Sequence, residues 1–126
     1  MSELPDLPRQ IVKREASVTP RVLEWFRTLY KRSCAIEVKC TDGNSIPKSA
    51  LMEHQRLALL AATGEGIVHK LSDEARRKQP FDAFQLVSVP AYVVACFTKH
   101  RKCLVIPVEE WRGAKESTNA PYIIRW

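Results

Sequence analysis

Apolar and charged residues alternate along positions 34–40, and this pattern of period two predicts a β-strand. Successive side chains of a strand point to opposite faces, so Glu37 and Lys39 share one face with Ala35. The other face is formed by Cys34, Ile36, Val38 and Cys40. A carboxylate and an amine that lie side by side on a core strand are costly to bury unless they are solvated, paired or bound to a metal. The charged pair is therefore the first candidate for function.

A helix is predicted before this strand. It begins at Thr19, a good N-cap residue, with Pro20 at the first helical position, and extends to about Arg32. Its apolar residues recur at helical spacing and form an inward stripe, whereas its basic residues occupy the outer face. Residues 1–18 combine prolines and mixed charges without a periodic apolar pattern, which predicts a flexible N-terminal arm.

A second helix is predicted after the polar turn at 41–45. It extends from about Ser49 to Thr63, and Gly64 supplies the usual left-handed C-terminal residue. Gln55 lies on the side of this helix that carries its apolar residues. A glutamine in that position needs hydrogen-bond partners, so it is either a local structural amide or part of a site.

Apolar runs in the second half of the chain predict further strands, since they are rich in Val, Phe and Tyr. The runs are 66–71, 81–89, 91–98 and 102–108, and the last three are expected to form a meander. The charged segment 72–80 between them is typical of a solvated loop.

This order of elements predicts one domain of the α/β or α+β class, with a mixed central sheet flanked by helices. We expect this domain to span residues 19–112. Residues 113–126 follow as a C-terminal tail, whose apolar end at 122–126 packs on the core or on a partner.

The composition favours a polyanionic partner. Twenty Lys and Arg against fourteen Asp and Glu give a net charge of +6, which favours nucleic acid, although a basic soluble protein without such a partner is the alternative. The sequence lacks a signal-peptide pattern and an apolar run long enough to span a bilayer. The four cysteines form no C-x-x-C pair, which indicates reduced thiols and a cytoplasmic protein. Because no apolar run is long enough to span a bilayer, we expect no membrane partner.

Phosphodiester hydrolysis is a chemistry that uses a carboxylate and an amine side by side. Carboxylates hold Mg²⁺, which orients and acidifies a water, while an amine stabilises charge that develops on the phosphate. A second carboxylate is needed, and Asp82 is our first choice because it begins a predicted strand after a turn. Asp42 and Glu24 are further candidates, and Glu24 is retained as a possible additional acid.

The stretch IEVKCTDGNSIPKSALMEHQ at positions 36–55 resembles the PD-(D/E)xK nuclease superfamily. It is most similar to Holliday junction resolvases of the bacterial recombination type, in which the E-x-K strand precedes a turn with proline and a helix with His-Gln. The resemblance implies a restriction-endonuclease-like fold and a Mg²⁺-dependent endonuclease of DNA recombination and repair, in which Mn²⁺ can substitute. It implies that Glu37 binds the metal, that Lys39 is the catalytic lysine, and that Gln55 lies beside the site.

The sequence departs from that superfamily in the place of its aspartate, which usually precedes the E-x-K strand. Here the matching segment PFDAF lies downstream, so Asp82 would join Glu37 as metal ligand and catalytic residue in a rearranged order. The missing upstream aspartate supports an alternative, a catalytically inactive nuclease fold that binds DNA or another subunit.

A junction-resolving enzyme is expected to grip branched DNA and to act as a two-fold homodimer. The candidate phosphate-binding residues are Arg27, Lys31, Arg32, Lys48, Arg76, Arg77, Lys78, Lys99, Arg101 and Lys102. A third hypothesis is a small interaction subunit that is anchored through residues 122–126.

Overall fold

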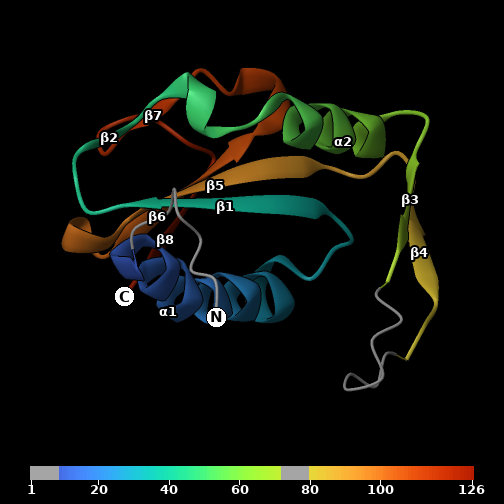
Figure 1. Cartoon of the computed structure of the whole chain (residues 1–126), viewed down its shortest axis with the longest axis horizontal. Helices are drawn as coiled ribbons and strands as arrows, with labels where there is room; N and C mark the ends of the chain where they lie inside the picture. Colours follow the sequence, from blue (N-terminus) through green and yellow to red (C-terminus); the bar gives the residue numbers. More distant parts are fainter. Residues whose placement is uncertain (1–8, 72–79) are drawn as a thin grey trace.

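The computed structural model describes residues 9–71 and 80–126. A four-stranded sheet lies between two α-helices (Figure 1). Its strand order is β1 (Ala35–Thr41), β5 (Ala91–Phe97), β6 (Lys102–Pro107) and β8 (Tyr122–Arg125). β1 and β5 are parallel, whereas β6 pairs antiparallel with both β5 and β8. The prediction of a mixed α+β domain is therefore confirmed.

Helix α1 (Arg9–Trp25) covers one face of the sheet and continues into a π-helical turn, η1 (Phe26–Tyr30). Val18, Val22 and Phe26 are buried against this face. They are spaced four residues apart, so the apolar stripe continues upstream of the proline. The predicted helix start at Thr19 is therefore wrong, and Pro20 lies inside α1.

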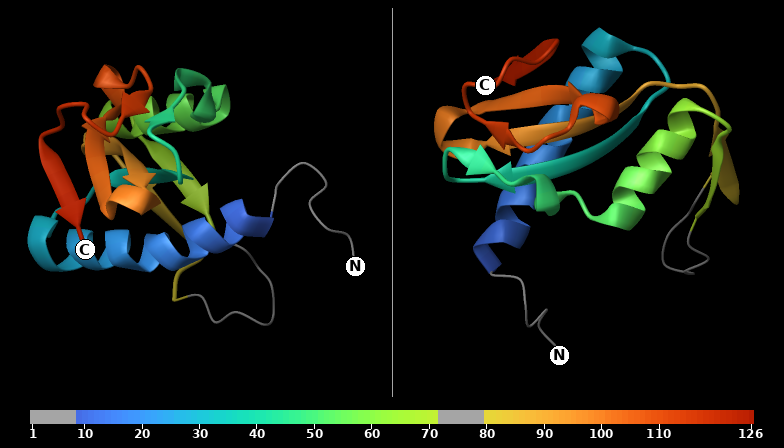
Figure 2. Two further views of the ribbon diagram at one scale, coloured as in Figure 1. Left: turned by 90° about the vertical axis from the view of Figure 1, so that its left-hand side faces the viewer. Right: turned by 90° about the horizontal axis from the view of Figure 1, so that it is seen from above.

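Helix α2 (Glu53–Thr63) covers the opposite face, after a short 3-10 turn η2 (Lys48–Ala50). The two helices lie on opposite sides of the sheet in the left view of Figure 2. α2 ends before Gly64 as expected, but the left-handed backbone is found at Gly66, with φ +109°. A side chain there would clash with Val87.

Two smaller sheets complete the fold. β2 (Ser45–Ile46) pairs with β7 (Ala114–Lys115), and β3 (Ile67–Lys70) pairs with β4 (Ala83–Leu86). The expected three-strand meander is therefore wrong in its first strand, because β4 pairs with β3 rather than with β5. The backbone N–H groups of Ser88 and Val89 bond to carbonyls at the end of α2, and this redirects the chain between β4 and β5.

The central strands β5 and β6 form most of the core, and their alternate residues pack into one cluster on each face of the sheet. All seven residues of β5 are buried, as expected for a strand covered on both sides. Short 3-10 turns, η3 (Thr98–His100) and η4 (Val108–Glu110), follow β5 and β6. The C-terminal segment adds β8 to the sheet edge, and its Ile124 is buried on the α1 side. No helix in the described part of the chain is both long and apolar enough to cross a membrane.

Cys96 and Cys103 form a disulfide between β5 and β6. Their positions lie directly opposite each other in the antiparallel register, and both side chains are buried. The prediction of reduced thiols is wrong for this pair, because the spacing of cysteines along the chain does not reveal which strands pair. Cys34 and Cys40 are not part of a disulfide.

Candidate functional site

The two faces predicted for β1 are the faces that the structure shows. The residues at 34, 36, 38 and 40 pack against the α1-side cluster, whereas Ala35 packs against the α2-side cluster. Glu37 and Lys39 share the face of Ala35 and so lie on the α2 side. β1 is at an edge of the four-stranded sheet, and its parallel partner β5 places Val93 beside Glu37.

Gln55 connects α2 to this strand. Its Nε2 donates a hydrogen bond to Oε2 of Glu37 at 3.2 Å, and its Oε1 accepts one from the backbone N–H of Met52 at 3.1 Å. The amide therefore satisfies the first turn of α2 and the strand carboxylate at the same time. The bond from the N–H of Met52 shows the structural role considered for Gln55, whereas its role in a site stays a prediction that the contact with Glu37 makes testable.

Lys39 completes a three-residue cluster, which we call the Glu-Lys-Gln cluster. Its Nζ lies 3.5 Å from Oε2 of Glu37, the same oxygen that Gln55 contacts. The side chains of Lys39 and Glu37 are 18% and 32% exposed, so the pair is only partly solvated. The ammonium and the amide neutralise and orient the carboxylate in the free protein, while solvent still reaches the strand edge.

The donors of this cluster match a divalent-metal site only in part. Among residues 9–71 and 80–126 there is no group of three or more His, Cys, Asp or Glu side chains that could hold a metal. Glu37 thus offers a single carboxylate. Mg²⁺ is often held by one or two carboxylates and takes its other ligands from water and substrate phosphates, so Glu37 would supply one ligand and the others would have to come from outside the cluster.

Asp82 is not brought to Glu37. It lies next to the start of β4, where its carbonyl accepts a hydrogen bond from the N–H of Leu71. β3 and β4 form a hairpin that leaves the C-terminal end of α2 and extends past the sheet, and the end of the hairpin farther from α2 lies away from the middle of β1 in Figure 1. The structure therefore offers no contact between these two carboxylates.

Of the other candidate acids, Glu24 lies on the opposite side of the sheet from the cluster. Glu24 is exposed on α1 and pairs with Arg27, with an N–O distance of 2.7 Å. It lines a surface pocket with the end of β8, at the sheet edge opposite β1. Asp42 follows β1 in an exposed turn.

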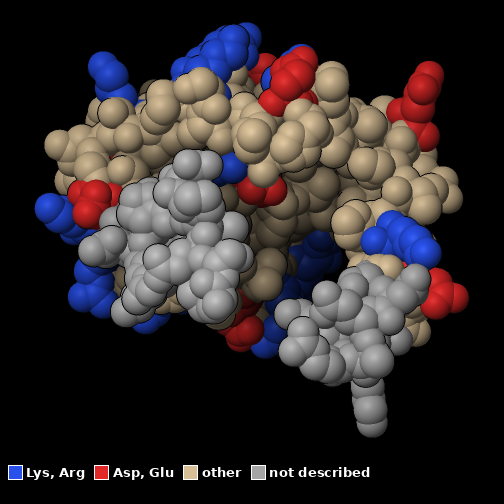
Figure 3. Space-filling view, viewed as in Figure 1, with Lys and Arg blue, Asp and Glu red and all other residues tan. Residues whose placement is uncertain are grey.

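The candidate phosphate-binding residues are distributed over several surfaces. Lys31 and Arg32 follow η1, whereas Lys99 and Arg101 lie in the turn between β5 and β6. Lys102 pairs with Glu116, with an N–O distance of 3.2 Å. Arg76, Arg77 and Lys78 lie outside the described residues. In Figure 3 the surface is hollowed between the sheet and the hairpin, and Lys or Arg side chains are visible inside this hollow.

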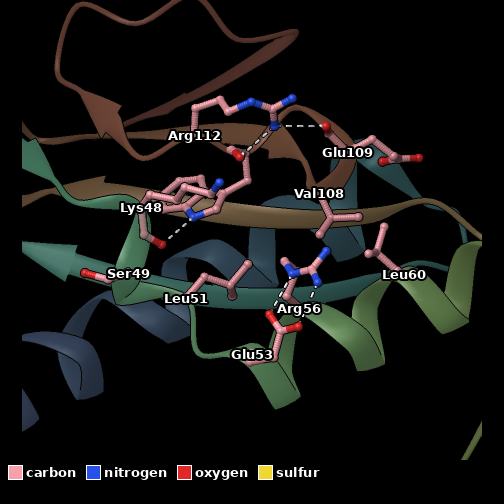
Figure 4. A pocket seen from close by; sticks show the side chains of 10 residues that line it. Lys48, Ser49, Leu51, Glu53, Arg56, Leu60, Val108, Glu109 and Arg112 are labelled. Carbon is pink, nitrogen blue, oxygen red and sulfur yellow. Dashed lines mark hydrogen bonds and ion pairs between the residues drawn. The ribbon is translucent and has the colours of Figure 1, made fainter.

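Lys48 lines a separate pocket of about 860 Å³ between η2, α2 and η4 (Figure 4). Two further cations that the sequence did not single out line it, Arg56 and Arg112. Arg56 pairs with Glu53, and Arg112 donates to the carbonyl oxygens of Glu109 and Trp111. The spacing of three residues between Glu53 and Arg56 on a predicted helix is the sequence feature that could have indicated their ion pair. Of these cations, Arg56 is paired with a carboxylate, whereas Arg112 is bonded to neutral carbonyl oxygens.

The chain matches no protein-family model, and no curated protein or solved structure matches it significantly.

Proposed function

We propose that this protein is a Mg²⁺-dependent endodeoxyribonuclease of the PD-(D/E)xK type that hydrolyses branched DNA such as a Holliday junction. The observation that carries the proposal is the contact between Glu37 and Gln55, which lie 18 residues apart in sequence. The resemblance assigned both residues to one site, and each is held beside Lys39 by a different element. The mixed sheet between two helices supports the finer assignment to a restriction-endonuclease-like fold.

Each residue of the cluster has a role in this proposal. Glu37 would hold Mg²⁺ together with waters and a phosphate of the substrate. The bound ion would orient and acidify the attacking water and stabilise charge on the phosphate. Lys39 would move from Glu37 toward the phosphate and stabilise the charge that develops there. Gln55 acts as a positioning residue, because it holds the carboxylate through a hydrogen bond.

The substrate and assembly follow from the same proposal. A net charge of +6 supports a DNA partner, and binding should weaken steeply with salt. A four-way junction has two equivalent scissile strands, so we propose that a two-fold homodimer acts on it. Because the substrate would be DNA inside a cell, we propose that the protein acts in the cytoplasm.

The direct test is cleavage of four-way junction, flap and duplex DNA in Mg²⁺, in Mn²⁺ and in EDTA. Wild type should cut branched DNA only with metal, and Glu37→Gln and Lys39→Gln should lose cleavage. His54→Ala is the matched control, because His54 is exposed on α2 next to Gln55. Absence of cleavage by the wild type on every substrate would refute the enzyme proposal.

A second candidate is a nuclease-like domain that binds DNA without cutting it. It is favoured by the absence, among the described residues, of a group of three or more His, Cys, Asp or Glu side chains that could hold a metal, and by the ion pair of Glu37 with Lys39. It predicts salt-dependent junction binding that Glu37→Gln leaves unchanged, and no shift of the melting temperature on addition of Mg²⁺ or Mn²⁺.

A further inference from the structure

A small aromatic pocket of about 330 Å³ opens where α1 ends, on the face of the sheet opposite the Glu-Lys-Gln cluster. Its lining consists of Trp25, Leu29, Tyr30, Arg32 and Tyr122. Tyr122 lies on β8, so the pocket joins the end of a helix to the edge strand of the sheet. Its volume is at the lower end of the range of small-ligand sites, about 300–1,000 Å³.

The π-helical turn creates this arrangement. The backbone N–H of Lys31 bonds to the carbonyl of Phe26, a spacing of five residues, at 2.8 Å. Residues five apart project about 140° away from each other on a regular α-helix. Here the rings of Trp25 and Tyr30 are stacked, with centroids 6.2 Å apart and an angle of 28° between their planes. π-helical turns are frequent at functional sites.

A buried layer holds the aromatic rings in place. The hydroxyl groups of Tyr30 and Tyr92 lie 2.8 Å apart and share a hydrogen bond. Tyr92 is buried beneath the pocket on β5, and Phe26 packs against Tyr30 with centroids 5.4 Å apart. Tyr122 stands nearly perpendicular to Tyr30, with centroids 5.7 Å apart. The ring faces are therefore pre-organised, which lowers the entropic cost of binding a flat ligand.

The positive charge of the pocket lining disfavours cationic ligands and favours flat ligands that carry a negative charge. The guanidinium of Arg32 lies 6.0 Å from the centre of the Tyr30 ring, and no carboxylate lines the pocket. An organic cation such as a methylated lysine would meet this arginine without a countercharge. A nucleobase has no such conflict, because it stacks on aromatic rings while its phosphate is attracted to arginine. Lys31 adds a second exposed cation beside the pocket.

We infer that the aromatic pocket binds an unpaired nucleotide of single-stranded DNA, with the base stacked on the ring of Tyr122 or Trp25 and the phosphate at Arg32. This inference rests on the proposed function, since it names the feature of branched DNA that the nuclease would recognise. Unpaired bases occur in flaps, in single-stranded gaps and at branch points where pairing is incomplete, whereas the bases of an intact duplex are stacked within the helix. The pocket therefore gives selectivity for DNA structure without reading sequence.

The test is binding, measured without Mg²⁺ so that cleavage plays no part. Fluorescence anisotropy would compare an oligothymidylate of about ten nucleotides with a duplex of the same length, because single-strand sites cover about 4–16 nucleotides. Tyr122→Thr keeps the β-propensity of an exposed strand position and should weaken single-strand binding about 5- to 150-fold. Arg32→Gln should weaken it and lower the salt slope by about one.

Two control variants distinguish loss of the pocket from a general loss of DNA binding. Ile123→Thr changes the neighbouring residue of β8, which is 41% exposed on the other face, and should leave binding unchanged within about twofold. His54→Ala, at an exposed position of α2 on the other side of the sheet, should also bind normally. Because this assay contains no metal, a protein that binds single strands through the pocket but never cleaves DNA would refute the nuclease proposal and not the pocket. Oligouridylate and a trimethyl-lysine peptide test RNA and cation ligands in the same assay.

Several results would overturn the inference. They are equal affinity for single-stranded and duplex DNA, no single-strand binding by the wild type, and preference for the RNA or the peptide. Unchanged single-strand binding by both Tyr122→Thr and Arg32→Gln would overturn it as well. Arg32 is exposed, so its variant remains informative if Tyr122→Thr does not fold.

Discussion

Replacement of Gln55 by alanine tests the geometry of the cluster independently of any activity. The variant loses the hydrogen bond to Glu37 and the bond that satisfies the N–H of Met52. A hydrogen bond to a charged group contributes about 1.5–3 kcal/mol, but Glu37 is 32% exposed and water replaces part of it, which leaves about 1 kcal/mol. Loss of the N-terminal contact costs about 1 kcal/mol, and the higher helix propensity of alanine returns about 0.5.

The expected loss of unfolding free energy is therefore about 1.5 kcal/mol. For a chain of 126 residues this corresponds to a decrease in melting temperature of about 6 °C. Urea unfolding followed by tryptophan fluorescence and by circular dichroism measures the loss, with the slope of the transition unchanged. His54→Ala, at an exposed position on the same helix, should stay within about 0.5 kcal/mol of the wild type.

A double-mutant cycle assigns the loss to the contact itself. Gln55→Ala and Glu37→Ala should be less destabilising together than the sum of the two single variants, by about 1 kcal/mol. Additive effects within about 0.3 kcal/mol would show that the two side chains do not interact. That result would remove the observation on which the proposed function depends.

Three further outcomes are expected. Asp82→Asn should leave metal-dependent cleavage within about twofold of the wild type, because Asp82 is bonded to Leu71 at the β3–β4 hairpin and makes no contact with Glu37. A large loss in the cleavage assay would show that the two carboxylates do share an ion. Alkylation of the denatured, non-reduced chain followed by peptide mass analysis should label Cys34 and Cys40 alone, and label on Cys96 without reductant would contradict the disulfide. Burial and the hydrogen bond with Tyr30 raise the pKa of Tyr92, so its contribution to stability is complete below the ordinary tyrosine value near 10 and is lost as the pH rises above it. Urea unfolding at increasing alkaline pH measures this loss, and a loss that Tyr92→Phe does not reduce would refute it.

The site residues on β1 and α2 were predictable because each depends on a local pattern. Alternation of period two separates Glu37 and Lys39 from the apolar residues of β1, and no tertiary information is needed for that. Gln55 was recognised as an inward polar residue on a helix, and its partner was expected from the resemblance. The structure shows a hydrogen bond between Gln55 and Glu37, while their shared role in a site stays a prediction.

Other features depended on pairing between distant segments. The disulfide requires Cys96 and Cys103 to be opposite each other on β5 and β6, which a register decides and spacing along the chain does not. Pro20 favoured a helix start because proline is common at the first position of a helix. The helix nevertheless begins upstream of Pro20, and Val18 extends its buried apolar stripe in that direction. The pairing of β4 with β3 was hidden for the same reason, because two apolar runs alone do not specify a partner.

The place of β1 at the sheet edge has a consequence for how variants of this protein should be designed. Glu37 and Lys39 are the two charged side chains of a seven-residue edge strand. Charges on such a strand discourage pairing with the same strand of another molecule, because association would bury them. Replacing both with alanine would leave the sequence AIAVACT along an open edge and would invite aggregation. Glutamine at both positions removes the charges and keeps polar groups there, so it is the safer choice for an inactive protein.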